Sequence, residues 1–326
     1  MMDRSTTRRR DREAARRART ERKRRIRRSR ALAVASVVGM IGCGEVRGDT
    51  TNAAGNTVLC EVETKAMGMD DPLRETSGLA ESRKEPGVYW THNDSGRQPD
   101  IFAVTAEGRS VGQARVTGAR NRDWEDIASG RCPDGGDACL YLADTGNNDN
   151  DRKEVSLWVV PEPATTVPST APATEYRARF PGEPTDIEAI ALLPDGRIYL
   201  VSKGSKGPVT LFRWPTPLRQ GHEATLEQVR ALAPHPEQVG DRVTAASATP
   251  DGKWVAVRTY AALAFYRTAD LLGGGLPYAQ FDLDPIAEPQ GEGVALANDG
   301  NVVLSSEGPE QGLPGTISHM RCILPQ

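Results

Sequence analysis

The stretch DWEDIA, residues 123–128, places three carboxylates and a tryptophan directly ahead of an apolar pair. Carboxylates can transfer protons, act as nucleophiles or bind a hard cation such as Ca2+. Several of them in one narrow space repel each other, so they need a cation, hydrogen bonds or altered protonation. The chemistry open to this stretch therefore depends on which other charges the fold brings to it.

The pattern around this stretch returns along the chain. Each copy has a polar or acidic entry, a short apolar strand, a turn, and a second β-rich strand that ends in polar residues. The copies span residues 75–94, 123–146, 186–204, 242–260 and 290–308, and their starts lie 48 to 63 residues apart. In the last three copies the turn between the two strands contains Asp-Gly, a strong hairpin signal. Two more candidate strands follow each hairpin, so the repeat predicts four-stranded β-propeller blades.

The last copy supplies only three strands before the chain ends, the final one over residues 316–324. The missing fourth strand is available near the other end, over residues 56–64. Pairing these two strands closes the ring and removes its open edges. We therefore predict an all-β fold, a five-bladed propeller over residues 56–326. The alternative is a six-bladed ring with a degenerate blade in 205–245 or 43–74.

The cysteines downstream of Cys43 favour the same closure. Cys60, Cys132, Cys139 and Cys322 allow three pairings. Cys132 and Cys139 flank the turn-rich PDGGDA, which predicts a local disulfide and leaves Cys60 to pair with Cys322. A bridge across so long a loop stabilises by about 5–6 kcal/mol in the chain-entropy model. The absence of any C-x-x-C spacing disfavours a zinc site.

In a propeller, the first strand of each blade lines the central channel. Alignment on the turns gives equivalent channel positions to Ser77, Glu125, Glu188, Thr244 and Glu292. Two residues earlier, on the same strand face, stand Glu75, Asp123, Asp186, Arg242 and Gln290. The sequence thus predicts an acidic centre at the channel mouth.

The candidate catalytic residues of this centre are Glu125, Glu188 and His92, the last standing at the channel end of its strand. A structural alternative stays open, in which the carboxylates cap strand ends and pair with Lys203 and Arg258. No G-x-S-x-G, H-E-x-x-H, P-loop or dinucleotide motif points to another chemistry.

The N-terminal residues have the order of an export signal. Residues 1–30 carry 15 Lys or Arg, and residues 31–42 carry no charge, which predicts a signal peptide over 1–42. The site before Cys43 resembles the lipobox of bacterial lipoproteins, and this resemblance implies lipidation of Cys43 and a tether over 43–55. The alternatives are a nucleic-acid-binding arm and an uncleaved signal anchor.

Removal of residues 1–42 changes the charge balance. The first thirty residues contain 15 of the 41 basic and 4 of the 44 acidic residues. The remainder of the chain therefore has 26 basic and 40 acidic residues, a net charge of −14. A chain of this charge attracts cations and does not bind nucleic acid by bulk electrostatics.

The repeated motifs DWEDIA…LYLADTGNN, DIEAIALLPDGRIYLVSKG, VTAASATPDGKWVAVRTY and GEGVALANDGNVVLSSEG resemble those of exported bacterial β-propellers of the phytase-like and calcium-dependent phosphotriesterase-like group. The resemblance implies a Ca2+ site at the channel mouth and basic side chains that meet a phosphate ester. Its candidate metal ligands here are Glu125, Glu188, Glu292 and Asp144, and its candidate substrate-binding residues are Lys203 and Arg258.

From these patterns we expect a cell-envelope lipoprotein on the periplasmic or extracellular face, held to the membrane by lipidated Cys43. The expected function is metal-dependent hydrolysis of phosphate or other esters. The alternative is a non-catalytic surface module that binds a glycan or a protein. We expect a monomer with no nucleic-acid partner.

Overall fold

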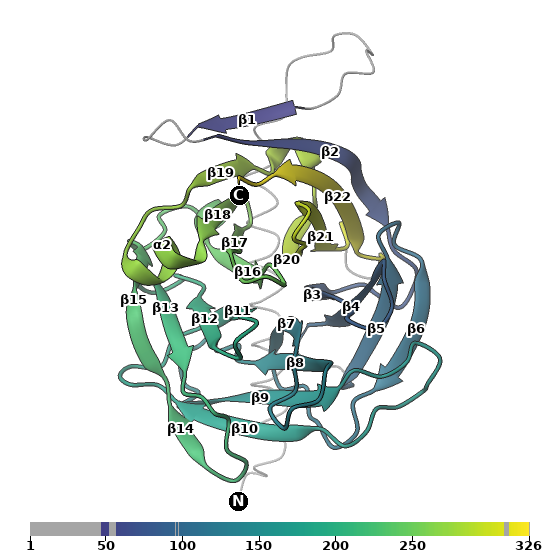
Figure 1. Ribbon diagram of the computed structural model, residues 1–326, viewed down its shortest axis with the longest axis vertical. Coiled ribbons are helices and arrows are strands. Elements are labelled where there is room, and N and C mark those ends of the chain that lie inside the picture. Colours follow the sequence, from purple (N-terminus) through teal and green to yellow (C-terminus); the bar gives the residue numbers. More distant parts are fainter. Residues whose placement is uncertain (1–46, 52–56, 95, 97, 310–312, 326) are drawn as a thin grey trace, which may run out of the picture. The chain divides into compact units, whose positions relative to one another are not determined.

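The computed structural model describes residues 47–51, 57–94, 96, 98–309 and 313–325. The predicted signal peptide and Cys43 lie outside these residues. The described residues belong to one compact unit, and their five antiparallel sheets stand around a common axis (Figure 1). The five-bladed propeller predicted from the sequence is therefore confirmed.

Blades I to V follow the chain, each with its first strand at the axis. Blade I consists of β3 (Thr76–Glu81), β4 (Val88–Asn93), β5 (Asp100–Thr105) and β6 (Ser110–Arg115). Blade II consists of β7 (Trp124–Gly130), β8 (Cys139–Asp144), β9 (Glu154–Pro161) and β10 (Thr174–Arg179). Blade III consists of β11 (Ile187–Leu192), β12 (Ile198–Ser202), β13 (Val209–Trp214) and β15 (Glu227–Ala233).

Blade IV consists of β16 (Val243–Ala248), β17 (Trp254–Thr259), β18 (Ala262–Arg267) and β19 (Ala279–Asp282). Blade V joins β20 (Gln290–Leu296), β21 (Asn301–Glu307) and β22 (Thr316–Ile323) to the N-terminal β2 (Thr57–Gly68) and β1 (Arg47–Thr51). The described helical segments are α2 (Thr268–Gly273) and the 3-10 turns η1 (Val239–Asp241) and η2 (Asp284–Ile286). None of the described helices is long and apolar enough to cross a membrane.

The ring closes where the first and last strands pair. β2 runs antiparallel to β22, with Cys60 opposite Cys322, and the two form a disulfide. The second disulfide joins Cys132 to Cys139 at the β7–β8 turn. Both predicted pairings are confirmed, and two disulfides suggest an oxidising, exported compartment.

The core is divided among the blade interfaces. Five clusters of buried apolar side chains occur, and each joins two neighbouring blades, as Trp90 and Trp124 do between blades I and II. The inner strands are therefore covered on both faces, which explains why β8 and β11 are buried along their whole length. Burial of this apolar area is the main force that holds the blades together.

Segments of the following blade cover the outer strands of blades I to III. Thr170 N–H donates to Arg115 O of β6 at 2.9 Å, and β14 (Glu223–Thr225) pairs in parallel with β10. Arg230 of β15 donates to Gly275 O at 3.0 Å, beyond the end of α2. Covered edges cannot pair with another chain, so the Pro/Thr-rich connection near residues 161–175 has a structural role.

Candidate functional site

The first strand of each blade, which lies innermost, has a shift of register near its N-terminal end. The strand pairing breaks between Thr76 and Leu79, Trp124 and Asp126, Ile187 and Ala189, Val243 and Ala245, and Gly291 and Val294. Each break contains one of the aligned channel residues, which are all buried: Ser77, Glu125, Glu188, Thr244 and Glu292. A β-bulge redirects a side chain out of the regular alternation, so the repeat places five redirected side chains around the axis.

The carboxylates converge into two overlapping groups. Oxygens of Glu125, Asp186 and Glu188 all lie within 4.8 Å of one another, and so do oxygens of Asp94, Asp123 and Glu125. We call these groups the inner trio and the outer trio, and Glu125 belongs to both. Together they join blades I, II and III.

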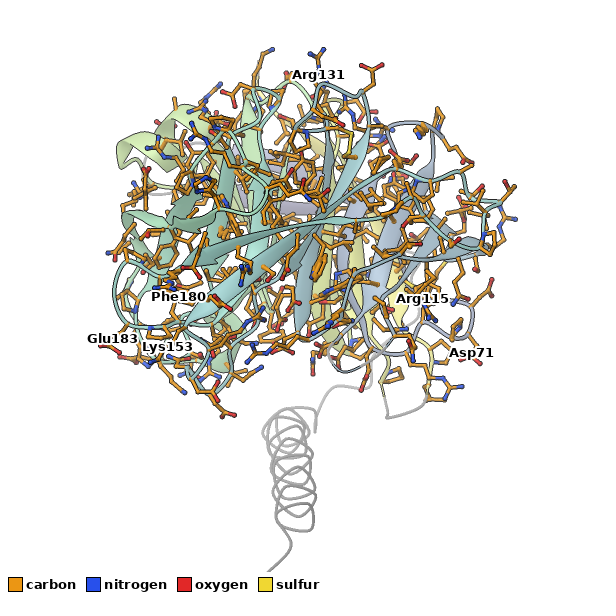
Figure 2. The ribbon with its side chains drawn as sticks, turned by 90° about the horizontal axis from the view of Figure 1, so that it is seen from below. Asp71, Arg115, Arg131, Lys153, Phe180 and Glu183 are labelled. Carbon is orange, nitrogen blue, oxygen red and sulfur yellow. A yellow bond between two sulfur atoms is a disulfide. The ribbon has the colours of Figure 1, made fainter. Side chains whose placement is uncertain are left out.

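This acidic centre lies at the entry end of the inner strands. Asp71, Lys153 and Glu183 belong to connections at that end of the propeller, whereas Arg131 follows β7 at the opposite end (Figure 2). The hairpin turns, with their Asp-Gly pairs, lie at the Arg131 end, away from the acidic centre.

A lysine enters the inner trio. Lys203 directly follows β12, and its Nζ lies 2.7 Å from Glu188 Oε1 and 4.0 Å from Asp186 Oδ2. Burial by itself lowers the pKa of the Lys203 ammonium, but the Glu188 carboxylate and other nearby charges outweigh it, and the pKa lies well above the ordinary lysine value. Lys203 is therefore a permanent positive charge of this centre at physiological pH.

The carboxyl groups of the centre hold protons more tightly than usual. Burial raises the pKa of Glu125 well above its ordinary value, and the Glu188 charge adds to the effect. Burial also raises the pKa of Glu188, against the opposing effect of Lys203. For Glu292, burial and the Glu307 charge raise the pKa to about 8. Glu292 therefore exchanges its proton near neutral pH.

Two carboxylates of the inner trio lack hydrogen bonds that their burial would call for. Glu125 is 7% exposed and its side chain accepts no hydrogen bond from the part of the chain that the structure describes. Asp186 Oδ1 accepts a hydrogen bond from Asn147 N at 2.6 Å, but its buried Oδ2 has no such partner among the described residues. Buried polar atoms without partners are costly, and this cost marks the inner trio as a place where a ligand would stabilise the protein.

Residues directly after the second strand of each blade complete the centre. These equivalent residues are Asp94, Thr145, Lys203, Tyr260 and Gly308. Burial and the Glu292 charge raise the pKa of the Tyr260 phenol well above its ordinary value, so Tyr260 stays neutral. Sequence reasoning did not select Tyr260, Asp94 or Asp186 as site residues. Applying the repeat alignment to the position directly after each second strand would have identified Tyr260 and Asp94.

His92 lies beneath the centre, between blades I and II. Its ring is fully buried and meets the Trp124 ring edge-on, with centroids 5.6 Å apart. Nδ1 lies 3.2 Å from Asn93 O, and Nε2 has no hydrogen-bond partner within the described residues. Burial lowers the pKa of His92 to about 4, so the ring is neutral at physiological pH.

Asp144 and Arg258 are bound to protein groups other than the trio carboxylates. Asp144 Oδ1 accepts hydrogen bonds from Arg152 Nη1 at 2.8 Å and from Asp123 N at 3.1 Å. The fully buried Arg258 guanidinium pairs with Glu288 and donates to Ser305 O at 3.1 Å. Since these contacts anchor neighbouring strands, we leave both residues out of the proposed ligand and substrate sets.

One carboxylate lies at the centre of the ring and binds backbone alone. The fully buried Asp126 accepts hydrogen bonds from Ile127 N at 2.9 Å, Ile190 N at 2.9 Å and Ala246 N at 3.2 Å. Gly78 of β3 packs so closely on it that a Cβ there would overlap the carboxylate. Asp126 therefore ties the inner strands of blades II, III and IV together and touches blade I, immediately beside the bulged site residues.

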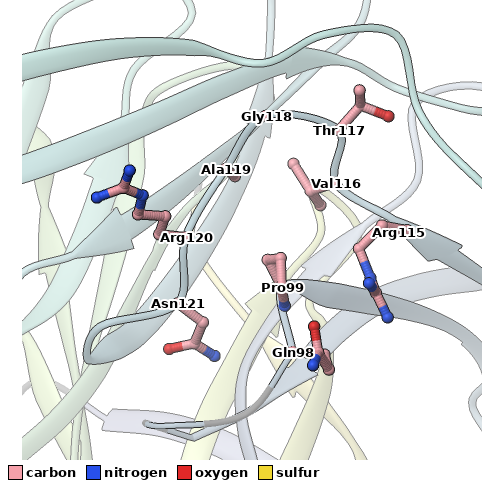
Figure 3. A pocket seen from close by; sticks show the side chains of 9 residues that line it. All are labelled: Gln98, Pro99, Arg115, Val116, Thr117, Gly118, Ala119, Arg120 and Asn121. Carbon is pink, nitrogen blue, oxygen red and sulfur yellow. The ribbon is translucent and has the colours of Figure 1, made fainter.

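A shallow depression of about 570 Å³ lies near the centre (Figure 3). Its lining residues are Gln98, Pro99, Arg115, Val116, Thr117, Gly118, Ala119, Arg120 and Asn121. Asn121 connects it to the strand ends of blade I, because its Nδ2 donates to Asn93 O at 3.2 Å. None of the trio carboxylates lines this depression, so it is a neighbour of the acidic centre and not part of it.

Comparisons with known proteins return structural similarity only. No family model and no curated protein matches the sequence. A gluconolactonase of Xanthomonas campestris shares 11% identity at a TM-score of 0.48, over 89% of this chain and 99% of that one. The PQQ-bound aldose sugar dehydrogenase of Streptomyces coelicolor shares 13% identity at a TM-score of 0.48, over 82% and 98% of the two chains. Similarity at this level does not bear on activity.

Proposed function

We propose that this β-propeller is an exported, metal-dependent hydrolase of phosphate or other esters, with the acidic centre as its reaction site. The observation that carries the proposal is the convergence of the two trios, which share Glu125 and in each of which the carboxylate oxygens lie within 4.8 Å of one another. Folding alone does not require Glu125 and Asp186 Oδ2 to be buried without hydrogen bonds. Clusters of acids with displaced pKa values are typical of functional sites.

The donor set fits a hard divalent cation. Carboxylate oxygens are the ligands that Ca2+ prefers, and Ca2+ tolerates irregular geometry. Thr244 Oγ1, at the equivalent bulge of blade IV, is a further buried oxygen with no hydrogen-bond partner among the described residues. Once bound, such a cation would polarise the ester and acidify a water molecule.

The side chains of the centre supply the remaining functions. Glu292, with a pKa of about 8, can give and take a proton near neutral pH. We assign Glu125 and Glu188 to positioning water. Lys203 would offset negative charge that develops on the ester oxygens. Since the His92 ring is buried and neutral, we assign proton transfer to Glu292 and not to His92.

The test combines cation binding with turnover. Thermal unfolding of the full-length chain in detergent is measured with Ca2+ and with a chelator, and hydrolysis is measured on a panel of phosphate esters, carboxylic esters and lactones. We expect Ca2+ to raise the unfolding midpoint, and Glu125→Gln to abolish both effects. Glu162→Gln is the matched control, because Glu162 is a buried carboxylate that accepts from Trp90 Nε1 at 3.0 Å, outside both trios.

Two outcomes would redirect the proposal. No midpoint shift and no turnover would overturn it. Cation binding without turnover of any ester would favour the non-catalytic binding module, with a surface glycan or protein as its partner.

We further propose that Cys43 carries the lipid that holds the chain at the cell envelope. Incorporation of labelled fatty acid into the wild type, and its loss in Cys43→Ser, is the expected result. Equal labelling of both proteins would contradict the anchor.

A further inference from the structure

The position of Lys203 within the inner trio resembles the position of a bound ion. Its Nζ lies 2.7 Å from Glu188 Oε1 and 4.0 Å from Asp186 Oδ2, and its charge also acts on Glu125. Lys203 thus pairs with two carboxylates of that trio and interacts electrostatically with the third. The ammonium is covalently part of the chain and cannot diffuse away.

A divalent cation and this ammonium would compete for the same oxygens. A bound Ca2+ needs carboxylate oxygens at about 2.3–2.6 Å, and Glu188 Oε1 is already in contact with Lys203. Two cations on one set of three oxygens would also repel each other strongly in a buried site. The inner trio therefore disfavours a divalent cation for as long as Lys203 stays in place.

The outer trio offers a second position. Its oxygens also lie within 4.8 Å of one another, and it includes Glu125, which is buried and accepts no hydrogen bond from the described residues. Gly146 lies against Glu125 Oε1 and Asp123 Oδ2 so closely that any Cβ there would overlap them. Asp94 and Asp123 have further contacts within the protein, which a cation would replace or share.

We propose that the acidic centre has two cation positions, that Lys203 fills the inner one as a built-in cation, and that one divalent cation binds the outer one through Asp94, Asp123 and Glu125. This inference rests on the proposed function, and it specifies the number and the place of the metal ions. Glu125 then lies between the two positive charges, which explains how its carboxylate is tolerated beside four others.

The first test is the number of cations bound per chain, measured by equilibrium dialysis of the full-length protein with Ca2+ and, separately, with Tb3+. We expect one cation for the wild type and two for Lys203→Gln, because the substitution removes the built-in charge. Lys206→Gln, which removes an exposed lysine three residues away, is the matched control and should bind one. Lys203→Arg keeps the charge and should also bind one.

The second test locates the cation in the wild-type background and does not depend on whether Lys203→Gln folds. Asp123→Asn should weaken binding at least tenfold, whereas Asp186→Asn should leave the affinity within about threefold. Folding of each variant is checked by circular dichroism and by its unfolding midpoint.

The outcomes separate this inference from the proposed function. Three results would each overturn the inference but remain compatible with a metal-dependent hydrolase. They are two cations bound to the wild type, only one bound to Lys203→Gln, and loss of the wild-type cation in Asp186→Asn. No cation on the wild type but one on Lys203→Gln would overturn the proposed metal dependence, while it supports Lys203 as the built-in cation.

Discussion

The carboxylate of Asp126 in blade II accepts a hydrogen bond from the backbone N–H of Ala246 in blade IV, 3.2 Å away and 120 residues further along the chain. The same oxygen accepts from Ile190 of blade III. Each of these amides lies two residues after a bulged site residue, Glu188 or Thr244. Asp126 is therefore the group that sets how the bulged side chains of three blades, Glu125, Glu188 and Thr244, lie relative to one another.

Replacement of Asp126 by Asn should destabilise the propeller by about 2–4 kcal/mol, because an amide can accept on one side only. Its NH2 group then opposes either the Ile127 amide or the Ile190 and Ala246 amides. Chemical denaturation measures the change. Asp299→Asn, at an exposed turn, is the control and should cost less than about 0.5 kcal/mol. An equal, small effect of both substitutions would contradict the role given to Asp126.

The two disulfides should differ in their contribution to stability. In the chain-entropy model, loss of Cys60–Cys322, which spans 262 residues, costs about 5–6 kcal/mol, and loss of Cys132–Cys139, which spans 7, costs about 2–3 kcal/mol. Paired Cys→Ala variants, compared by their denaturation midpoints, test this order. A larger loss from the Cys132–Cys139 pair would show that ring closure is not the greater constraint.

The carboxyl groups of the centre should make stability fall as pH rises. The folded-state pKa of Glu292 is about 8, above that of the unfolded chain, so the folded protein binds the proton more tightly. Its contribution is complete below about pH 4.5 and is lost as pH rises through 8, at up to about 1.4 kcal/mol per pH unit. Glu125 and Glu188 act in the same direction.

Unfolding midpoints between pH 5 and 9, in the presence of a chelator, measure this loss. We expect Ca2+ to reduce the slope, because it stabilises the ionised carboxylates, and we expect Glu292→Gln to remove the part of the slope near pH 8. A flat profile, or stability that rises over this interval, would contradict the assignment.

His92 and Glu292 should affect the pH profile of hydrolysis differently. We expect Glu292→Gln to lower kcat/KM by about 100-fold or more and to remove the limb near pH 8. His92→Gln should leave the shape of the profile unchanged, because the wild-type ring is already neutral above about pH 4. A profile whose limb disappears with His92 would reassign the proton transfer to that residue.

Arg258 should contribute to stability through Glu288. Arg258→Met leaves a buried carboxylate without its cation and is expected to cost about 3–5 kcal/mol. The double variant with Glu288→Gln should recover much of this loss. If Arg258→Met instead raised KM for an anionic ester without loss of stability, the result would support the substrate-binding role that the sequence analysis predicted for Arg258.

The sequence determined the repeat and the closure of the ring. The repeated strand–turn–strand pattern is a local signal, so its spacing alone predicts five hairpins of similar construction. Strand counting and the positions of Cys60 and Cys322 in the sequence then require the two ends to meet. The alignment also placed Glu125, Glu188 and Glu292 at equivalent places, because a propeller copies each strand position around its axis.

Only the tertiary structure decided which charges share a site. Lys203 and Arg258 look alike as basic residues near second-strand ends, yet Lys203 points into the inner trio and Arg258 into a buried pair with Glu288. Their surroundings come from neighbouring blades, at distances along the chain that no local pattern encodes. Electrostatic interaction depends on separation in space and on burial, and both are fixed only when the blades pack around Asp126.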